Sequence, residues 1–324
     1  MAPVAEVFKA EPPTAFDSVV GLLVASVFST VYLLAPLYVI GQLIALALAP
    51  TSHVVWACAV PLLVSVAIPP TACPNLVQSA AFGCMLRYFS FEMRCEKGAT
   101  TTEIEEHTAA GRHFVLAAQP HGIISYVGIC SASACSRKLL LGFPTAAASV
   151  IMKFPVLKNV MGVFGLVDAS KRSLMRALTR HGVVIYIGGI AELFLSSARR
   201  EVLFVQKRKG FIKLAMQSGC DVIPLYLFGN TTVLSALSVG PLAALSRSAG
   251  VSLTYFWGRW GLPLPRPVKL VYVRGAPLGM PKIDEPTQQQ IDEWHAKYVS
   301  EVTRIFNEHK DTLSDYAEKQ LEMR

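Results

Sequence analysis

Charged residues are scarce in this chain, and one long stretch has none. Asp, Glu, Lys and Arg make up 16% of the 324 residues, against roughly a quarter in ordinary soluble domains. None of the four occurs between Asp17 and Arg87. A helix needs about 20 apolar residues to cross the hydrocarbon core of a bilayer. Val19–Leu48 and His53–Ile68 are therefore predicted to form a membrane hairpin, or one span followed by a re-entrant stretch, separated by a turn that contains Pro50.

Two other interpretations of this apolar stretch are a cleavable signal peptide and a helix buried in a soluble core. A signal peptide has a basic start and an apolar run of roughly 7–15 residues. This leader instead carries Glu6, Glu11 and Asp17, and its apolar run is longer. A charge-free run of this length is also unusual for a soluble core. We expect residues 1–86 to form an N-terminal tail and membrane hairpin, and residues 87–324 to form a separate domain.

Several motifs that would indicate other chemistries are missing. There is no G-x-S-x-G elbow of a serine hydrolase, no P-loop and no G-x-G-x-x-G for a dinucleotide. None of the seven histidines has an aspartate five positions later, so the H-x-x-x-x-D pattern of glycerophosphate acyltransferases is absent. The seven cysteines contain no C-x-x-C pair, which indicates reduced thiols and neither a disulfide framework nor a metal site. Basic residues are scattered and lack a stacking or zinc-finger motif, so no nucleic-acid partner is expected.

The net charge of +8 resides after Arg87. By the positive-inside tendency this places the basic domain on the cytosolic side of the membrane. Basic surface beside a bilayer attracts anionic headgroups and also substrates that carry phosphates.

After Arg87, short β-rich apolar segments alternate with amphipathic ones. The expected strands are Phe114–Ala118, Thr145–Ile151, Gly165–Val167, Val183–Ile187, Val222–Phe228 and Lys269–Val273. The expected helices are Arg172–His181, Gly210–Gly219 and an amphipathic tail from Thr287 to Met323. A further apolar region, Leu234–Leu245, with Trp257 and Trp260 after it, fits either the membrane interface or a plain insertion. The alternation predicts an α/β fold with a mostly parallel sheet flanked by helices.

Two polar segments directly follow expected strands. One is Gln119–Gly122, and the other runs from Gly188 to Glu192. Ligands on parallel sheets usually bind beyond the carboxyl ends of the strands, so we expect these segments to share a site. A neutral imidazole at His121 can accept a proton from an alcohol, although many turn histidines only cap backbone groups. Glu192 either orients that histidine or is an ordinary acid favoured at a helix N-terminus.

A third candidate feature is the basic run at residues 207–209 before Gly210, at the start of an expected helix. Cations and free helix N–H groups together suit phosphate binding. A solvated charge run is the simpler interpretation. The sequon at Asn230 is expected to have no function if this part of the chain faces the cytosol.

Together these blocks resemble the type-2 diacylglycerol acyltransferases. The resemblance rests on Gln119–Gly122, on the GGIAEL stretch around Glu192, and most specifically on the block from Arg208 through Ala215 to Gly229. Blocks at Arg259–Pro263 and Val273–Leu278, the amphipathic tail and the N-terminal hairpin are also similar to that family. The family commonly has histidine or glutamate where this chain has Gln119, and its Tyr-Phe-Pro block appears as Tyr88–Ser90.

The resemblance implies a glycerolipid-acyltransferase-like fold and transfer of an acyl group from acyl-CoA to diacylglycerol, giving triacylglycerol. Acyl-CoA would be a co-substrate, and no cofactor is implied. It also implies a location at the endoplasmic reticulum membrane and lipid droplet surface. Monoacylglycerol and long-chain alcohols stay open as acceptors, as does a non-enzymatic lipid-binding role. Whether the chain forms a homo-oligomer stays open as well.

The site that we expect from these observations has four parts. His121 is the general base, with Glu192 as its partner. Backbone N–H groups near Gly122 are expected to stabilise the oxyanion, and Pro120 belongs to the same turn. Substrate-binding roles are expected for Gln119, Gly188, Gly189, Arg208, Lys209, Gly210 and Phe211. No metal ligand is expected.

Overall fold

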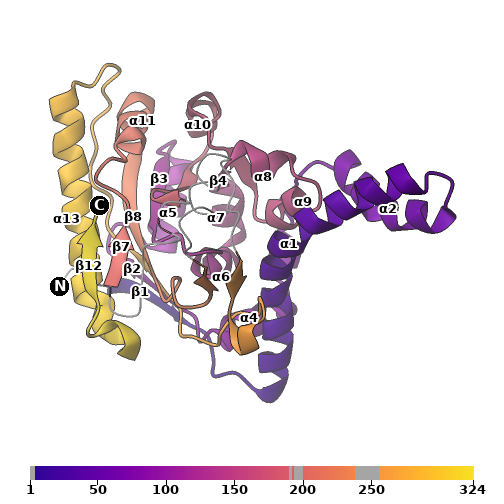
Figure 1. Ribbon diagram of the computed structural model, residues 1–324. Helices are drawn as coiled ribbons and strands as arrows, with labels where there is room; N and C mark the ends of the chain where they lie inside the picture. The colour runs from indigo at the N-terminus through magenta and orange to yellow at the C-terminus, as the bar shows by residue number, and fades with distance from the viewer. Residues whose placement is uncertain (1–3, 190–191, 193–199, 238–254) are drawn as a thin grey trace.

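An eight-stranded sheet organises the described part of the chain, in the order β1-β2-β11-β8-β3-β6-β4-β5. The computed structural model in Figure 1 describes residues 4–189, 192, 200–237 and 255–324. The strands of the sheet are β1 (Val4–Lys9), β2 (Glu92–Glu96), β3 (Phe114–Gln119), β4 (Thr145–Ala147), β5 (Leu166–Asp168), β6 (Val183–Tyr186), β8 (Asp221–Phe228) and β11 (Val271–Arg274).

Most neighbouring strands are parallel, which confirms the expected sheet type. β3 is parallel to both of its neighbours, β8 and β6, and the series continues in parallel through β4 to β5. β11 is antiparallel to β8, and β1 is antiparallel to β2. The carboxyl ends of β3, β6 and β8 therefore lie together at one edge of the sheet.

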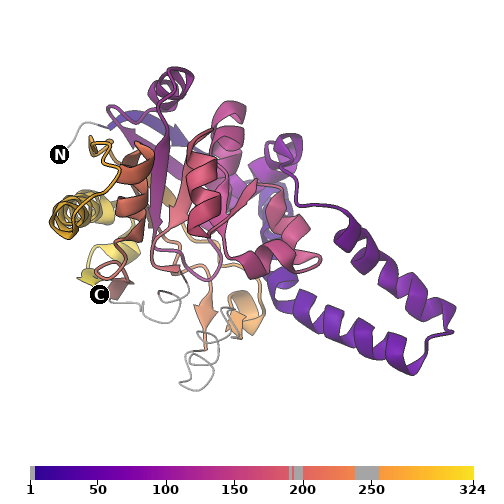
Figure 2. The same ribbon diagram turned by 90° about the horizontal axis from the view of Figure 1, so that it is seen from above.

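Helices cover both faces of the sheet (Figures 1 and 2). One face is covered by α10 (Lys171–Leu178), α11 (Gly210–Ser218) and α13 (Gln288–His309). The other is covered by α4 (Ala80–Tyr88), α5 (Thr101–Ala109), α6 (Tyr126–Ala134) and α7 (Arg137–Gly142), with part of α1. The shorter helices are α3 (Pro74–Val77), α8 (Ser149–Lys153) and α9 (Leu157–Gly162).

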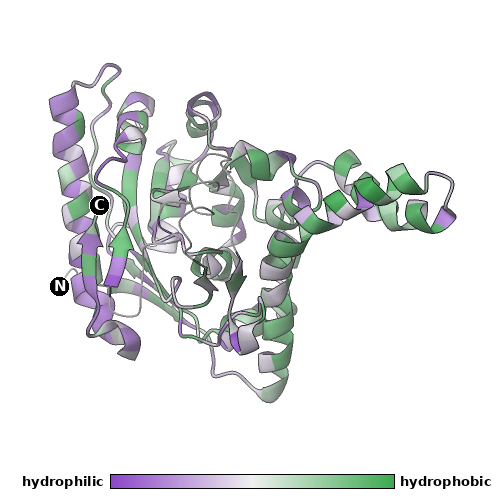
Figure 3. Ribbon diagram, viewed as in Figure 1, coloured by the Kyte–Doolittle hydropathy of each residue, from purple (hydrophilic) through white to green (hydrophobic). Residues whose placement is uncertain are grey.

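The N-terminal apolar stretch forms two helices, α1 (Ala15–Leu48) and α2 (His53–Ala67). They make the long arm that projects from the domain in Figure 2, and Figure 3 colours most of this arm as hydrophobic. Polar side chains inside the arm bond to the backbone of the partner helix: Tyr38 Oη donates to the Cys58 carbonyl at 2.7 Å, and Gln42 Nε2 donates to the Val55 carbonyl at 2.8 Å. Such internal pairing is what a bilayer core requires of polar groups.

Of the described helices, α1 is the one that is long and apolar enough to cross a membrane. Large apolar side chains on the outside of the arm are exposed, among them Leu37 at 64%, Leu48 at 82% and Val54 at 72%. Exposed apolar area on this scale is costly in water. The arm therefore supports association of the protein with a membrane.

The first part of α1 is packed against the domain. Phe28 is buried, with its ring 6.1 Å from that of Phe82 and 5.5 Å from that of Phe164. Near the helix start, Arg87 Nη2 lies 2.8 Å from Asp17 Oδ1. Before the helix, β1 pairs with β2 at the sheet edge. The division of the chain at residue 86 stays a prediction, and this strand joins residues on both sides of it.

Two expected elements are partly wrong. The strand predicted at Thr145–Ile151 ends at Ala147, and Ser149 starts α8, because a short apolar run fits a helix or a strand equally well. The tail helix ends at His309 and not near Met323. After two 3-10 turns at Lys310–Thr312 and Ser314–Tyr316, the chain forms β12 (Gln320–Met323), parallel to β7 (Arg200–Leu203). The amphipathic face predicted for the tail contains Ile291, Trp294, Tyr298, Val302, Ile305 and His309; all are buried except Trp294, which is partly buried.

The region after β8 is described only in part. β9 (Ser235–Ala236) pairs with β10 (Phe256–Trp257), and a 3-10 turn follows at Arg259–Gly261. The expected apolar region Leu234–Leu245 lies outside the described residues from 238 onward.

Candidate active site

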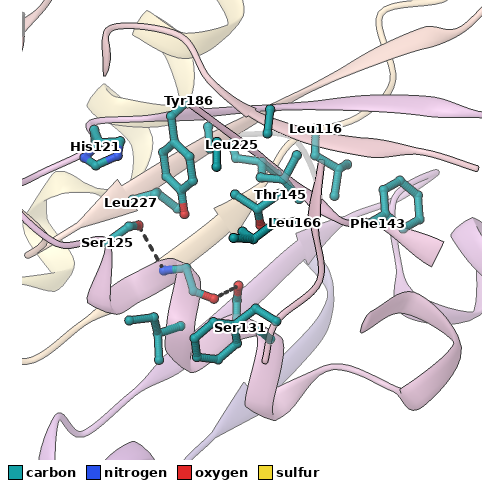
Figure 4. Close-up of a pocket in the computed structure, with 18 of the residues that line it drawn as sticks. Leu116, His121, Ser125, Ser131, Phe143, Thr145, Leu166, Tyr186, Leu225 and Leu227 are labelled. Carbon is teal, nitrogen blue, oxygen red and sulfur yellow. Dashed lines mark hydrogen bonds between the residues drawn. The ribbon is translucent and has the colours of Figure 1, made fainter. Parts of the chain in front are cut away.

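His121 lies just beyond the carboxyl end of β3, in the loop that leads into α6. Its half-buried ring lines an apolar pocket and meets the ring of Tyr186, at the end of β6, edge-on with 4.7 Å between centroids. Figure 4 shows these two side chains side by side at one end of the pocket. The structure thus brings together the ends of two neighbouring strands, as the sequence predicted.

The hydrogen bonding of the imidazole assigns its tautomer. His121 Nδ1 lies 2.6 Å from the carbonyl oxygen of Gly122. A carbonyl oxygen only accepts, so Nδ1 carries the hydrogen and Nε2 presents a lone pair. Burial lowers the pKa of the His121 imidazole below its ordinary value of 6.5, partly offset by the bond to Gly122. The ring is therefore neutral near pH 7, with Nε2 as its basic atom.

Glu192 is buried, and its carboxylate contacts backbone and not the imidazole ring. Oε2 accepts the N–H of His121 at 2.9 Å, and Oε1 accepts the N–H of Phe204 at 3.2 Å. Burial raises the pKa of Glu192 to about 7, against the opposing effect of these two hydrogen bonds. The acid thus holds the main chain at His121 from the side, and also fixes the segment that follows β7.

Two glycines make this geometry sterically feasible. Gly122 has φ +65°, and a Cβ there would lie 2.7 Å from the carbonyl oxygen of Asn230. A Cβ at Gly188 would lie 1.9 Å from the carboxyl carbon of Glu192. A side chain at either position would displace the loop or its support. The neighbouring Gly189, φ +53°, lines the apolar pocket.

Asn230, directly after β8, is a central residue of the site that sequence reasoning missed. Its Nδ2 donates to the carbonyl oxygens of Pro120 at 3.0 Å and His121 at 2.6 Å, and lies 3.3 Å from Ser125 Oγ. Its Oδ1 accepts the N–H of Val127 at 3.2 Å, in the first turn of α6. One buried amide therefore fastens both ends of the His121 loop. A signal was present, since Asn230 follows a strand end at the same sheet edge, but the residue was interpreted as part of a sequon.

The C-terminal tail supports Asn230 from behind. Tyr316 Oη accepts the N–H of Gly229 at 3.0 Å, and Thr231 Oγ1 donates to Glu201 Oε2 at 3.2 Å. Lys319 Nζ lies 3.3 Å from the same carboxylate oxygen, in an ion pair that is almost fully buried. Residues more than 80 positions downstream thus hold the loop that positions the histidine.

The apolar pocket has a volume of about 450 Å³, within the usual range for ligand pockets. It runs between the sheet and the helices α6 and α7, and Tyr32 of α1 also lines it. Leu116, Phe143 and Leu225 are among its walls (Figure 4). Its shape and lining suit a hydrocarbon chain, and its contact with α1 connects it to the membrane arm.

The remaining predicted site residues lie away from this pocket. Gln119 is fully buried, and the alternation of β3 places its side chain on the α11 and α13 face. Neither atom of its amide has a hydrogen-bond partner among the described residues. Phe211 is a core residue whose ring packs edge-on against Tyr298 at 4.8 Å.

The basic run before α11 lies at the same sheet edge as Glu192. Lys209 Nζ bonds to Asp292 Oδ1 at 2.8 Å, and the Arg208 guanidinium, on an exposed side chain, lies 5.1 Å from the ring centroid of Phe204. Gly210 starts the helix. The charged group of Arg208 is therefore exposed to solvent, whereas that of Lys209 is paired with Asp292.

One acid–histidine group in the described residues has the spacing of metal ligands: Glu96, Glu308 and His309. Arg304 Nη1 and Nη2 bond to the two oxygens of Glu96 at 2.9 and 2.8 Å, and Arg304 Nη1 also bonds to Glu308. Arg94 Nη1 lies 3.2 Å from His309 Nδ1. These arginines already supply the positive charge that a metal would bring, so the group is an ion-pair network.

A family model described as "Diacylglycerol acyltransferase" matches residues 86–324. The chain belongs to this family. Human 2-acylglycerol O-acyltransferase 3 is 32% identical over 224 residues, which covers 62% of this chain and 65% of that protein. Human diacylglycerol O-acyltransferase 2 is 29% identical over 223 residues, covering 61% of this chain and 57% of that protein. The fission yeast (Schizosaccharomyces pombe) diacylglycerol O-acyltransferase 1 is 29% identical over 245 residues, covering 69% and 68%.

The alignments thus span about two thirds of the length of the family members they match, or somewhat less. Among solved structures, the 1-acyl-sn-glycerophosphate (LPA) acyltransferase PlsC from Thermotoga maritima gives a TM-score of 0.45 at 13% identity, covering 91% of this chain and 98% of that one.

Proposed function

We propose that this member of the diacylglycerol acyltransferase family transfers an acyl group from acyl-CoA to the free hydroxyl of diacylglycerol. The observation that carries the proposal is the position of His121. Its ring lines a pocket of about 450 Å³ that is otherwise largely apolar, and its Nε2 is left with a free lone pair. A neutral base at one end of a pocket that suits a hydrocarbon chain can accept the proton of an alcohol as it attacks a thioester.

In this mechanism His121 Nε2 accepts the proton of the acceptor hydroxyl while the hydroxyl oxygen attacks the thioester carbonyl carbon. The C–S bond then breaks, and the departing thiolate of coenzyme A takes the proton back from Nε2. The transfer is direct, without an acyl-enzyme. The lowered pKa of His121 keeps the base neutral at the pH of the cytosol.

The negative charge that develops on the carbonyl oxygen has nearby donors. Within the described residues, the N–H groups of Gly122 and Ile123 have no hydrogen-bond partner in the protein. The N-terminus of α6 begins at Tyr126, a few residues further along, and the helix dipole favours negative charge there. Removing one donor from an oxyanion site typically costs about 3 kcal/mol of transition-state stabilisation.

Glu192 and Asn230 act as positioning residues, because they bond to the backbone of the His121 loop from opposite sides. Arg208 is exposed beside Glu192 at the edge of the sheet and would attract the phosphates of coenzyme A. Lys209 is paired with Asp292, and the amide of Gln119 lies on the sheet face away from the pocket, so we assign neither residue a direct contact with the reacting atoms.

The membrane arm would hold the pocket at the bilayer, where the acceptor is dissolved. Tyr32, on α1, lines the pocket wall, so a lipid can approach the pocket along the arm. With the basic domain on the cytosolic side, the protein would act at the endoplasmic reticulum membrane and at the surface of lipid droplets. The orientation rests on the distribution of charge, and the organelle on the family resemblance.

The acceptor is the part of the proposal with a real alternative. The similarity to human 2-acylglycerol O-acyltransferase 3 favours a test with monoacylglycerol, and a long-chain alcohol would use the same chemistry. A pocket that binds lipid without catalysis would have no need for a neutral imidazole held by two buried polar side chains.

The test uses microsomes from a host that lacks neutral-lipid synthesis, with labelled oleoyl-CoA. Diacylglycerol, monoacylglycerol and a fatty alcohol are supplied in parallel. Label is expected in triacylglycerol, and it should disappear in His121→Ala with expression and membrane association intact. His53→Ala, in the turn region of the arm, is the matched control and should retain activity. Labelled product only in another ester would identify a different acceptor. Substantial activity in His121→Ala would refute the proposed base.

A further inference from the structure

The apolar pocket contains one buried cation, Arg274, at the end of β11. The side chain is 4% exposed and lines the same pocket as His121. Nη1 donates to the carbonyl oxygen of Ala99 at 3.0 Å, and Nε lies 3.4 Å from Tyr272 Oη. A guanidinium has five N–H groups, so these two contacts leave most of its donors unused.

No carboxylate neutralises this charge. Among the described residues, no Asp or Glu has a carboxylate oxygen within 4.0 Å of the Arg274 guanidinium, whose hydrogen-bond partners are Ala99 and Tyr272. The segments outside the described residues, 1–3, 190–191, 193–199 and 238–254, contain no Asp or Glu. A buried charge without a partner is costly. Lys319, the other buried Lys or Arg among the described residues, has Glu201 as its carboxylate partner.

The register of the sheet separates Arg274 from His121 by two strands along the pocket wall. Arg274 pairs with Leu225 of β8, and Leu225 pairs with Ala118 of β3. His121 is three residues beyond Ala118, whereas Arg274 lies two strands to the side. With strands about 4.8 Å apart and a rise of about 3.3 Å per residue, the two Cα atoms are separated by roughly 14 Å. A hydrocarbon chain between them would have one end at the base and the other at the guanidinium.

We propose that Arg274 binds a carboxylate in this pocket, on a ligand whose hydrocarbon chain fills the rest. The planar fork of a guanidinium matches a carboxylate in a bidentate pair. The largely apolar lining excludes a nucleotide or a free phosphate, and requires that the anion be attached to a hydrocarbon chain. The inference rests on the proposed function, because it assigns the pocket to the acyl chain.

Two kinds of ligand can bring a carboxylate on a hydrocarbon chain to Arg274. A free fatty acid can enter with its carboxylate at Arg274, where it would compete with the acyl donor. Alternatively, the donor itself carries a second carboxylate at its far end, as a dicarboxylic acyl-CoA does. In the second case Arg274 would select the donor, because it would be paired only when the far carboxylate is present.

The test compares Arg274→Met, which keeps the length of the side chain and removes the charge, with Arg274→Lys, which keeps the charge. Arg180→Met, at an exposed arginine outside the pocket, is the matched control. Each full-length protein is purified in the same detergent. The first measurement is the binding of dodecanoate and of methyl dodecanoate, monitored through the shift in unfolding temperature that each ligand causes. The second is the ratio of kcat/KM for dodecanedioyl-CoA to that for dodecanoyl-CoA.

If Arg274 pairs with a carboxylate, Arg274→Met should weaken the binding of dodecanoate by about ten- to a hundredfold, as expected for hydrogen bonds to a charged group. Binding of the methyl ester should change little, and Arg274→Lys should restore part of the loss. A free acid as the source predicts this result alone. A dicarboxylic donor predicts in addition that the kcat/KM ratio falls by a similar factor in Arg274→Met.

Unchanged binding of dodecanoate together with an unchanged kcat/KM ratio would overturn the assignment. Failure of the proposed function is a separate result, because the wild type would then transfer neither acyl group. In that event the binding measurement alone still decides whether Arg274 recognises a carboxylate. A stability measurement without ligand adds a check: Arg274→Met should unfold at the same or a higher temperature, since it removes an unpaired buried charge.

Discussion

Replacing Glu192 by glutamine should change the pH dependence of stability in a direction that the structure specifies. The carboxylate is 2% exposed, and burial raises its pKa from 4.5 to about 7. A raised pKa means that the protonated form is favoured in the folded state. The stabilisation is fully present below pH 4.5 and is lost as the pH rises through 7. The difference between the two pKa values corresponds to about 3 kcal/mol.

Glutamine has nearly the same shape but cannot titrate. Its single carbonyl oxygen can accept the N–H of either His121 or Phe204 but not both, which costs about 1–3 kcal/mol for the group left without a partner. That cost does not depend on pH, and a protonated glutamate has a similar mismatch. Between pH 4.5 and 8, wild type should therefore lose about 3 kcal/mol relative to Glu192→Gln, which is a change of several degrees in the difference between their unfolding temperatures.

The assay is thermal unfolding of both proteins in one detergent, at closely spaced pH values from 4.5 to 8.5. All other titrating groups are shared and cancel in the difference. Glu318→Gln, at an exposed glutamate, should follow wild type at every pH. A difference between wild type and Glu192→Gln that stays constant across the range would show that burial does not raise the pKa of Glu192, and would refute this reasoning.

Two further predictions concern the base and its second support. Because burial lowers the pKa of His121 below 6.5, kcat/KM should fall toward acid with a midpoint below pH 6.5; a midpoint above 6.5 would contradict a desolvated imidazole. Asn230→Ala should lower kcat at least tenfold with a smaller change in KM. It should also destabilise the protein by about 2–4 kcal/mol, since it leaves several buried groups without partners. Asn307→Ala, at an exposed position, is the control and should have neither effect. Equal effects of Asn230→Ala on kcat and KM would argue against a role in placing the base.

The central strands and the position of His121 could be predicted because both are local properties of the sequence. Uninterrupted apolar runs such as Val183–Ile187 have few interpretations when glycines follow them, and parallel strands must bring their carboxyl ends to one edge. Thr145–Ile151 failed because its periodicity fits two structures, and the tail helix was extended past His309 because its polar pattern continues without a strong stop signal.

What the sequence could not provide are contacts between distant residues. The bonds of Asn230 to the His121 loop span about 110 positions. Its place after a strand end indicates the edge of the sheet, but not the contact with that loop. The hydrogen-bond partner of Glu192 could not be predicted either. An acid at a strand end can bond to a ring, a substrate or a backbone N–H, and in the structure Glu192 bonds to backbone N–H groups. The apolar pocket and the isolated charge of Arg274 depend on the register of three strands, which is a property of the assembled sheet.

The two faces of the sheet explain why the base is held through its backbone. On β3, Leu116 and Ala118 face the apolar pocket, while Val115 and Ala117 face α11 and α13. His121 lies past the end of the strand, so its main chain can reach Glu192 while its ring reaches the pocket. A carboxylate bonded to the ring would raise the pKa of the imidazole and hold a proton beside an apolar chain. By bonding to the N–H of His121, Glu192 fixes the position of the base and leaves Nε2 unprotonated. The support residues should therefore control how fast the acyl group is transferred more than how tightly the substrates bind.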